Sequence, residues 1–171
     1  MLTLSYILNI IGTVAMIAGL LCPGKKIKLI LFFTFLGNFL VATGYLVGGS
    51  GINGAISCYV GSAITIVNFI LQSKNKPIPK WLVAIYALAF ICLNLTGGFT
   101  WLCLLAIVAC MTFILSVIQN NGAIFRIWTF ANMILWITYD LLSKSYAGLI
   151  PHVIMLVFTL VGMLVQDRKK Q

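Results

Sequence analysis

The chain has 171 residues, of which 62% are hydrophobic and 8% are charged, and its formal net charge is +9. A soluble domain carries about 25% charged residues, so this chain lacks the polar side chains needed to cover a water-facing surface. The composition excludes a soluble globular protein and indicates an integral membrane protein.

Seven apolar runs follow one another along the chain, each near the length of about 20 residues that a membrane-spanning helix needs. In chain order they are Leu2–Leu21, Leu29–Val47, Ile52–Leu71, Trp81–Leu95, Phe99–Ile118, Ile124–Leu142 and Ala147–Val165. The runs are continuously apolar, whereas strands of a membrane barrel alternate apolar and polar residues, so the sequence predicts helices. The fourth run is short: either it begins inside the Pro77–Pro79 linker or the bilayer thins around it.

The basic residues predict how the helices are oriented in the membrane. All but Lys144 lie in the connections after the first, third and fifth runs or in the C-terminal tail. They are Lys25, Lys26, Lys28, Lys74, Lys76, Lys80, Arg126, Arg168, Lys169 and Lys170. Because basic residues accumulate on the cytoplasmic side, we expect the N-terminus outside and the C-terminus in the cytoplasm, which requires an odd number of spans. No basic residue precedes the first run, so we expect a retained helix rather than a cleaved signal peptide.

The charge and the reactive residues restrict the partners. No basic stretch is interleaved with aromatic residues in a water-exposed segment, so the net charge of +9 indicates anionic lipid at the cytoplasmic leaflet rather than nucleic acid. The chain has two acidic residues and one histidine, with no nucleophile–histidine–acid set and no glycine-rich phosphate loop. Its five cysteines lack metal-type spacing. We therefore expect no enzyme activity, no metal and no cofactor.

An internal repeat is visible when the chain is shifted by 94 residues against itself, because Leu8–Lys76 then aligns without a gap to Leu102–Lys170. Identical polar and glycine pairs carry most weight, since apolar residues coincide by chance. These pairs are Asn38/Asn132, Tyr45/Tyr139, Gly54/Gly148, Thr65/Thr159, Gln72/Gln166 and Lys76/Lys170. Each repeat holds three helices and the fourth run joins them, so both repeats enter the membrane in the same direction. The sequence thus predicts an all-α 3+1+3 arrangement with boundaries at residues 1–76, 77–98 and 99–171.

This plan resembles the SWEET and PQ-loop superfamily, which includes sugar facilitators, nicotinamide riboside transporters and the KDEL receptor. Within it, the size and the ending SYAGLIPHVIMLVFTLVGMLVQDRKK resemble the YgjV family of bacterial inner-membrane proteins. The resemblance covers essentially the whole chain and implies a multi-pass protein of the cell inner membrane. SWEET-type facilitators place hinge prolines in the first two helices of each repeat. The prolines of this chain, Pro23, Pro77, Pro79 and Pro151, lie elsewhere, so the transport mechanism of those relatives is not carried over.

Two asparagines interrupt the apolar runs at equivalent positions of the repeats. Asn38 lies near the centre of the second run and Asn132 near the centre of the sixth. A buried amide without a partner is costly in hydrocarbon, so both are expected to face the protein interior. A step of seven residues returns to nearly the same helix face, which places Tyr45 with Asn38 and Tyr139 with Asn132. Two interpretations remain open: hydrogen bonds between helices, or contact with a small neutral polar solute.

Other residues extend these two polar faces. Trp128 and Trp136 flank Asn132 by one helical turn on either side and offer flat aromatic surfaces. Thr65 and Thr159 occupy equivalent positions in the third helix of each repeat. For these threonines, contact between helices is the simpler explanation, and contact with a solute is the alternative.

The only histidine of the chain, His152, lies about one turn into the seventh run. Pro151 precedes it, in a first turn where proline is tolerated. Imidazole changes its charge near neutral pH, so His152 is either a proton-coupling residue or an ordinary interfacial histidine. Asp140 and Lys144, at the end of the sixth run, are spaced to form a solvated ion pair.

These features support two hypotheses of function. In the first, the protein transports a small, neutral polar solute by rocking two three-helix bundles around a midplane site. The site would consist of Asn38, Asn132, Tyr45, Tyr139, Trp128, Trp136, Thr65 and Thr159. In the alternative, the protein is a non-transporting receptor, sensor or assembly protein of the same fold. Its centre is then closed, and its amides bond only to each other or to neighbouring helices.

Overall fold

A computed structural model describes residues 2–48, 52–96, 98–144 and 146–167. All regular structure within these ranges is helical. The helices are α1 (Leu2–Leu20), α2 (Ile27–Gly48), α3 (Ile52–Ser73), α4 (Lys80–Leu95), α5 (Trp101–Val117), α6 (Gly122–Ser143) and α7 (Tyr146–Gly162), which continues into a π-helical turn, η1 (Met163–Asp167). The helical class predicted from the apolar runs is therefore confirmed, and each predicted run overlaps one helix.

Length and composition distinguish the helices. Four segments are long and apolar enough to cross a membrane, and they lie in α1, α2, α3 and α7 with η1. Helices α4 and α5 are apolar but shorter, with 16 and 17 residues. At a rise of about 1.5 Å per residue, α4 is about 24 Å long. Helix α6 has 22 residues and carries both Arg126 and Asp140.

The short fourth run gains no residues from its linker. Helix α4 begins at Lys80, directly after Pro79, which is extended and occupies the N-cap position. Proline disfavours the helical conformation in the residue before it, so Ile78 cannot extend α4 backwards. The alternative that the fourth helix begins inside the Pro77–Pro79 linker is therefore wrong.

Local side chains define the ends of the C-terminal helices. The side chain of Thr100 accepts a hydrogen bond from the Cys103 backbone nitrogen at 3.1 Å and caps α5. Asn121 caps α6 in the same way through Ala123, at 2.8 Å. Lys144 ends α6 in the left-handed conformation, with φ of 56°. These are the capping positions at which polar residues satisfy terminal backbone groups.

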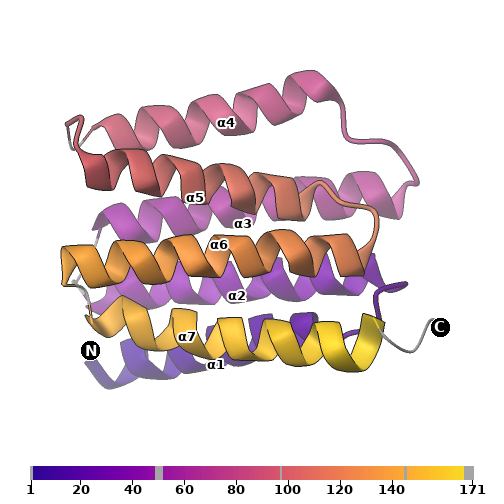
Figure 1. Cartoon of the computed structure of the whole chain (residues 1–171), viewed down its shortest axis with the longest axis horizontal. Helices are drawn as coiled ribbons and strands as arrows, with labels where there is room; N and C mark the ends of the chain where they lie inside the picture. The colour runs from indigo at the N-terminus through magenta and orange to yellow at the C-terminus, as the bar shows by residue number, and fades with distance from the viewer. Residues whose placement is uncertain (1, 49–51, 97, 145, 168–171) are drawn as a thin grey trace.

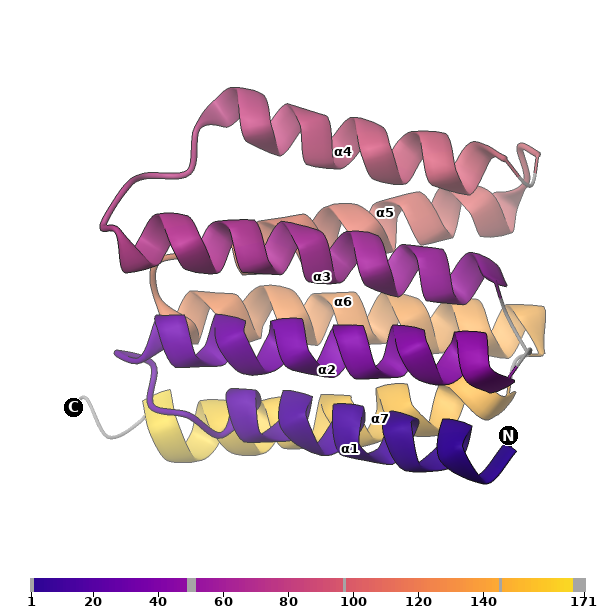
Figure 2. The same cartoon turned by 180° about the vertical axis from the view of Figure 1, so that it is seen from behind.

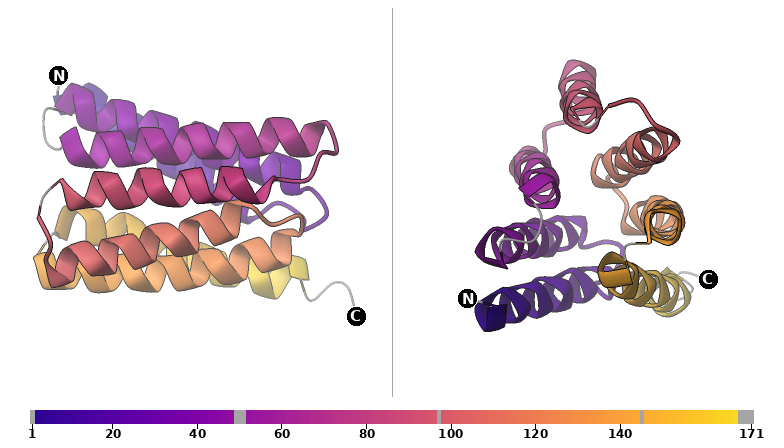
Figure 3. Two further views of the ribbon diagram at one scale, coloured as in Figure 1. Left: turned by 90° about the horizontal axis from the view of Figure 1, so that it is seen from above. Right: turned by 90° about the vertical axis from the view of Figure 1, so that its left-hand side faces the viewer.

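The helices run side by side along one axis, and successive helices are neighbours (Figures 1 and 2). Seen along that axis, α1, α2 and α3 form one row, here called the N-terminal wall (Figure 3). Helices α5, α6 and α7 form the facing row, here called the C-terminal wall. Helix α4 joins the two walls at one edge, and α1 contacts α7 at the other.

The two ends of the bundle differ in charge. The end at which α1, α3 and α5 finish carries the loop lysines and is called the basic end. Its described lysines are Lys25, Lys26, Lys28, Lys74, Lys76 and Lys80. The opposite end, at which α1 begins and α6 finishes, is called the far end (Figure 1). Among the described lysines and arginines, only Lys144 lies there.

Glycine allows α1 and α2 to approach closely. A Cβ added to Gly37 would lie 2.7 Å from the backbone oxygen of Gly12, so the helix backbones themselves are in contact. Nearby, the hydroxyl of Ser5 donates to the backbone oxygen of Gly44 at 2.7 Å. Small residues and such hydrogen bonds hold membrane helices together where the hydrophobic effect does not distinguish protein from lipid.

The outward surface of the bundle is apolar. Large hydrophobic side chains such as Ile10, Leu88 and Ile150 are at least 60% exposed in the isolated chain. A soluble monomer rarely exposes a continuous apolar surface of this kind. This surface is the one that lipid tails would cover.

Candidate functional site

Asn132 has well-defined contacts within the C-terminal wall. Its side chain is 3% exposed and lies on the face of α6 that packs against α5. The amide nitrogen donates to the backbone oxygen of Ala109 at 2.6 Å and to the hydroxyl of Thr112 at 3.1 Å. Asn132 therefore makes the kind of interhelical bonds that one of the two sequence interpretations describes.

Asn38 occupies the matching place in the N-terminal wall, with different contacts. Its amide nitrogen is buried and has no hydrogen-bond partner among the described residues. This nitrogen lies 3.8 Å from the position that a Cβ would take on Gly61, and that position is 3.5 Å from the ring of Phe113 on α5. Asn38 thus faces the interior, where the two walls approach, and it is not bonded to Asn132. A buried donor without a partner is uncommon in native proteins, and a bound solute would supply one.

Thr65 and Thr159 are both 0% exposed. Each hydroxyl donates at 2.7 Å to a backbone oxygen four residues earlier, Thr65 to Gly61 and Thr159 to Met155. Their donor protons are therefore used within their own helices. The equivalence of the two positions in the sequence is matched by equivalent bonds in the two walls.

At the far end, four side chains form what we call the far-end cluster. They are Trp136, Tyr139, Asp140 and His152. Nδ1 of His152 lies 2.6 Å from Oδ2 of Asp140, whose side chain is 5% exposed. The indole of Trp136 stacks on the imidazole, with ring centroids 5.7 Å apart and planes 15° apart, and meets the ring of Tyr139 edge-on at 5.4 Å.

The sequence prediction for Asp140 is wrong in one respect. We expected a solvated ion pair with Lys144, but the carboxylate is buried and its partner is His152 on α7. The reason is that α6 ends at Ser143, so Lys144 lies beyond the helix in a left-handed conformation. Pro151 also lies deeper than predicted, because α7 begins at Tyr146 and places it in the second turn.

The remaining two predicted site residues lie apart from each other. Tyr45 is half-buried on α2, within electrostatic reach of Asp140 on the opposite wall. Trp128 is half-buried on α6, about two turns from Trp136 towards the basic end. The predicted residues thus divide into a far-end group around Asp140 and residues nearer the middle of the bundle, of which Asn132 makes hydrogen bonds between helices.

Sequence reasoning missed the role of Arg126, which it counted among the loop cations. Its side chain is 0% exposed. Nε donates to the backbone oxygen of Leu20 at 2.8 Å, and an Nη atom donates to the backbone oxygen of Cys22. The other Nη atom pairs with Oδ1 of Asp167 at 2.7 Å. Arg126 therefore joins the end of α1 to α6 and η1, and its position inside an apolar run was the available signal.

Glycines make room for this guanidinium. A Cβ on Gly162 would lie 2.9 Å from Nε of Arg126 and 2.5 Å from the Leu20 oxygen. The backbone nitrogen of Gly122 donates to the oxygen of Gly24 at 3.0 Å. Close by, burial raises the pKa of the Cys22 thiol, against the opposing charges of Arg126 and Lys26.

Two side-chain amides on α3 also connect the two walls at the basic end. Asn68 donates to the backbone oxygen of Val117 at 3.1 Å and accepts from the Tyr86 hydroxyl at 3.0 Å. Gln72 donates to the backbone oxygen of Gln119 at 2.9 Å. We call the bonds of Arg126, Gly122, Asn68 and Gln72 across the walls the basic-end cluster. Within the described residues, every hydrogen bond between the two walls belongs to it.

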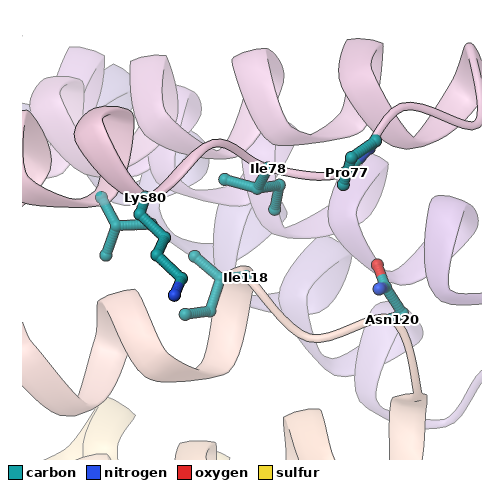
Figure 4. Close-up of a pocket in the computed structure, with 6 residues that line it drawn as sticks. Pro77, Ile78, Lys80, Ile118 and Asn120 are labelled. Carbon is teal, nitrogen blue, oxygen red and sulfur yellow. The ribbon is translucent and has the colours of Figure 1, made fainter.

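A groove of about 370 Å³ opens at the basic end, between the α3–α4 linker and the α5–α6 turn (Figure 4). It is lined by Pro77, Ile78, Lys80, Val83, Ile118 and Asn120. A smaller hollow at the far end is lined by Phe99, Thr100, Trp101 and Leu104. Neither contains a predicted site residue. No group of three or more metal-ligating side chains gathers in the part of the chain that the structure describes.

Comparison with known proteins supplies the family. Residues 4–170 match the family Imp-YgjV, which is described as 'Bacterial inner membrane protein'. Comparisons with the curated proteins and with the solved structures give no match. The match covers nearly the whole chain and agrees with its several long apolar helices, which together establish a multi-pass protein of the inner membrane. The chain therefore belongs to the Imp-YgjV family of bacterial inner membrane proteins.

Proposed function

We propose that this protein is a transporter or facilitator for a small, neutral polar solute. In this proposal all seven helices cross the membrane, the basic end faces the cytoplasm, and the two walls rock against each other. The solute site would lie between the walls, from Asn38 towards the far-end cluster.

One observation carries the proposal: the hydrogen bonds between the walls are confined to the basic end. A transporter that alternates its access must be held shut at one end at a time, and bonds confined to one end are suited to that role. The described arrangement then corresponds to a state closed towards the cytoplasm. Breaking the basic-end cluster would open the bundle towards the cytoplasm.

Two further features support a polar path on the far-end side. A buried carboxylate within an apolar helix is expensive, and such residues usually mark a pathway in membrane proteins. Asp140 is one, and its partner His152 stacks on the indole of Trp136, which meets the ring of Tyr139 edge-on. The unpartnered amide nitrogen of Asn38 adds a donor that a hydroxyl or carbonyl group of a solute would satisfy.

The helix boundaries support the proposed repeat. Shifted by 94 residues, α3 (Ile52–Ser73) falls on residues 146–167, the combined range of α7 and η1. Two rows of three helices, entering the membrane in the same direction, would supply the two rocking units.

Specific contacts favour the alternative, a non-transporting membrane protein. The Asn132 amide bonds to α5, and the hydroxyls of Thr65 and Thr159 bond within their helices, so these three residues have no free donor for a solute. If they represent the whole centre of the bundle, the protein is a receptor, sensor or assembly protein.

The two functions are separated by uptake into proteoliposomes that contain the purified full-length protein. A panel of radiolabelled sugars, polyols, nucleosides and small amides covers the proposed solute class. We expect uptake of at least one member above that of empty liposomes, and a loss of at least tenfold in Asn38→Leu. The matched control is Asn94→Leu, which removes an amide from α4, outside both walls. Absence of uptake across the panel would favour the non-transporting alternative.

A further inference from the structure

The far-end pair of Asp140 and His152 has a geometry that simple packing does not require. An ionised carboxylate can only accept hydrogen bonds, so with Asp140 ionised the 2.6 Å contact requires the proton to lie on Nδ1 of His152. The imidazole is otherwise held by the stacked indole of Trp136. Its side chain is 28% exposed, whereas that of Asp140 is 5% exposed. The second ring nitrogen, Nε2, makes no hydrogen bond among the described residues and remains free to take a proton.

The charge around this pair is not balanced by its neighbours. From α2, Tyr45 is within electrostatic reach of the Asp140 charge. On α6, Tyr139 contacts Trp136 through its ring, and Lys144 forms no ion pair with Asp140. None of these groups is a cation in contact with the carboxylate. Neutralisation of Asp140 therefore depends on His152.

We propose that Asp140 and His152 together form a binding site for one proton. Without that proton, Nδ1–H of the neutral imidazole donates to the carboxylate, and the pair has a net charge of −1. The proton is taken from water by the lone pair of Nε2, no other bond breaks, and the pair becomes a neutral imidazolium–carboxylate pair. The ligand is the proton itself, and Trp136 is the positioning residue that holds the imidazole.

This site gives a physical reason for coupling, which rests on the proposed transport function. Closing the far end removes water from the pair, and a net charge is far more costly than a neutral ion pair in a dry, low-dielectric interior. The far end would therefore close only with the proton bound. The proton would then bind before each closure and leave when the far end reopens.

The proton site can be tested without any solute, by the fluorescence of Trp136. A variant with Trp81→Phe, Trp101→Phe and Trp128→Phe retains Trp136 as its single indole. A cation stacked on an indole interacts with its face and quenches its emission. In lipid nanodiscs, we expect emission to fall reversibly as pH is lowered from about 8 to about 5, the range in which imidazole changes charge.

Three further variants assign that signal. His152→Gln should abolish the pH response. Asp140→Asn keeps the side-chain shape but removes the charge that stabilises the imidazolium, so quenching should be weaker at each pH. Ser143→Ala is the matched control, because its hydroxyl contacts only the backbone oxygen of Asp140. It should respond like the parent.

Two outcomes would overturn the proton site: no pH response in the parent, or an undiminished response in His152→Gln. Equal emission of the parent, Asp140→Asn and Ser143→Ala at high pH verifies that the stacking of His152 on Trp136 is intact. If the fluorescence test fails, the proposed transport of a solute is not affected. Conversely, a clear pH response combined with no uptake would leave the proton site standing and remove the transport function.

Discussion

Arg126 shows how strongly one buried charge is committed to a structural role. Its guanidinium is surrounded by two backbone oxygens at the end of α1 and by the Asp167 carboxylate. The planar fork of arginine can reach several acceptors at fixed angles, which lysine cannot do. The C-terminal carbonyls of α1 also carry the negative end of its helix dipole. Both the positive charge and the fork geometry of arginine are therefore needed at this position.

Replacing Arg126 by Gln should destabilise the protein by about 3 kcal/mol, because Asp167 and two carbonyls lose their partner. Arg126→Lys should recover only part of this, since lysine keeps the charge but not the fork. The free energy of unfolding, measured with sodium dodecyl sulfate in mixed micelles, provides the test. Lys25→Gln removes an exposed charge at the same end and should cost little. Equal stability of Arg126→Gln and Lys25→Gln would contradict the structural role.

The two central asparagines should respond differently to removal of the amide. Asn132→Leu breaks two interhelical hydrogen bonds and should lower the free energy of unfolding by roughly 0.6 kcal/mol, the average for such bonds. Asn38→Leu removes a buried donor that has no partner, so it should be neutral or stabilising. The same unfolding measurement compares them. A larger loss in Asn38→Leu than in Asn132→Leu would mean that Asn38 is the one bonded between helices.

At the level of helices, composition and periodicity predicted most of what the structure contains. Continuous apolar runs separated by Pro, Gly and Lys predicted the number and approximate ends of the helices, because membrane-spanning backbone must satisfy its own hydrogen bonds. The caps at Thr100 and Asn121 also depend on residues close in sequence, but they were not predicted.

The candidate site was less predictable because its bonds join distant segments. Arg126 and Leu20 are 106 residues apart, and Asp140 and His152 are 12 apart on different helices. Helical spacing identifies which residues share a face but not which face of another helix they meet. For that reason Asp140 was assigned to Lys144, its neighbour in sequence, rather than to His152.

The crossing of α1 and α2 should be sensitive to a single methyl group. In Gly37→Ala the new Cβ would stand 2.7 Å from the Gly12 backbone oxygen, so the helices must separate. We expect a loss of about 1–3 kcal/mol, the usual cost of overpacking. Gly61→Ala is the matched control on α3, because its Cβ would make an ordinary contact of 3.5 Å with Phe113. Unfolding of the two variants in detergent tests the difference, and equal stability would show that α1 and α2 separate without cost.

Across the whole molecule, charge is distributed very unevenly between the two ends. The chain carries a formal charge of +9 with only two acidic residues. Asp167 is paired with the buried Arg126, and Asp140 lies at the far end with His152. The loop lysines of the basic end are therefore without acidic partners among the described residues. We propose that anionic lipid head groups outside the protein supply their counter-charge.

The groove at the basic end is the place where this attraction should be most specific. Lys80 and Asn120 supply polar groups at its edge, while Ile78, Val83 and Ile118 form an apolar lining (Figure 4). A lipid phosphate beside Lys80, with an acyl chain along Val83, would satisfy both kinds of surface. We expect Lys80→Gln to weaken the stabilisation by anionic lipid by about 1 kcal/mol, the contribution of one cation near an anionic surface.

The measurement compares thermal unfolding in nanodiscs of phosphatidylglycerol with unfolding in nanodiscs of phosphatidylcholine. The parent should be more stable in the anionic lipid, and high salt should reduce the difference, because exposed charges are screened beyond a Debye length of about 8–10 Å. Lys144→Gln removes one cation from the far end and tests whether total charge alone is responsible. If both variants lose the same stabilisation, attraction is general and the groove has no special role. If only Lys80→Gln does, the basic end holds its lipid at a defined position.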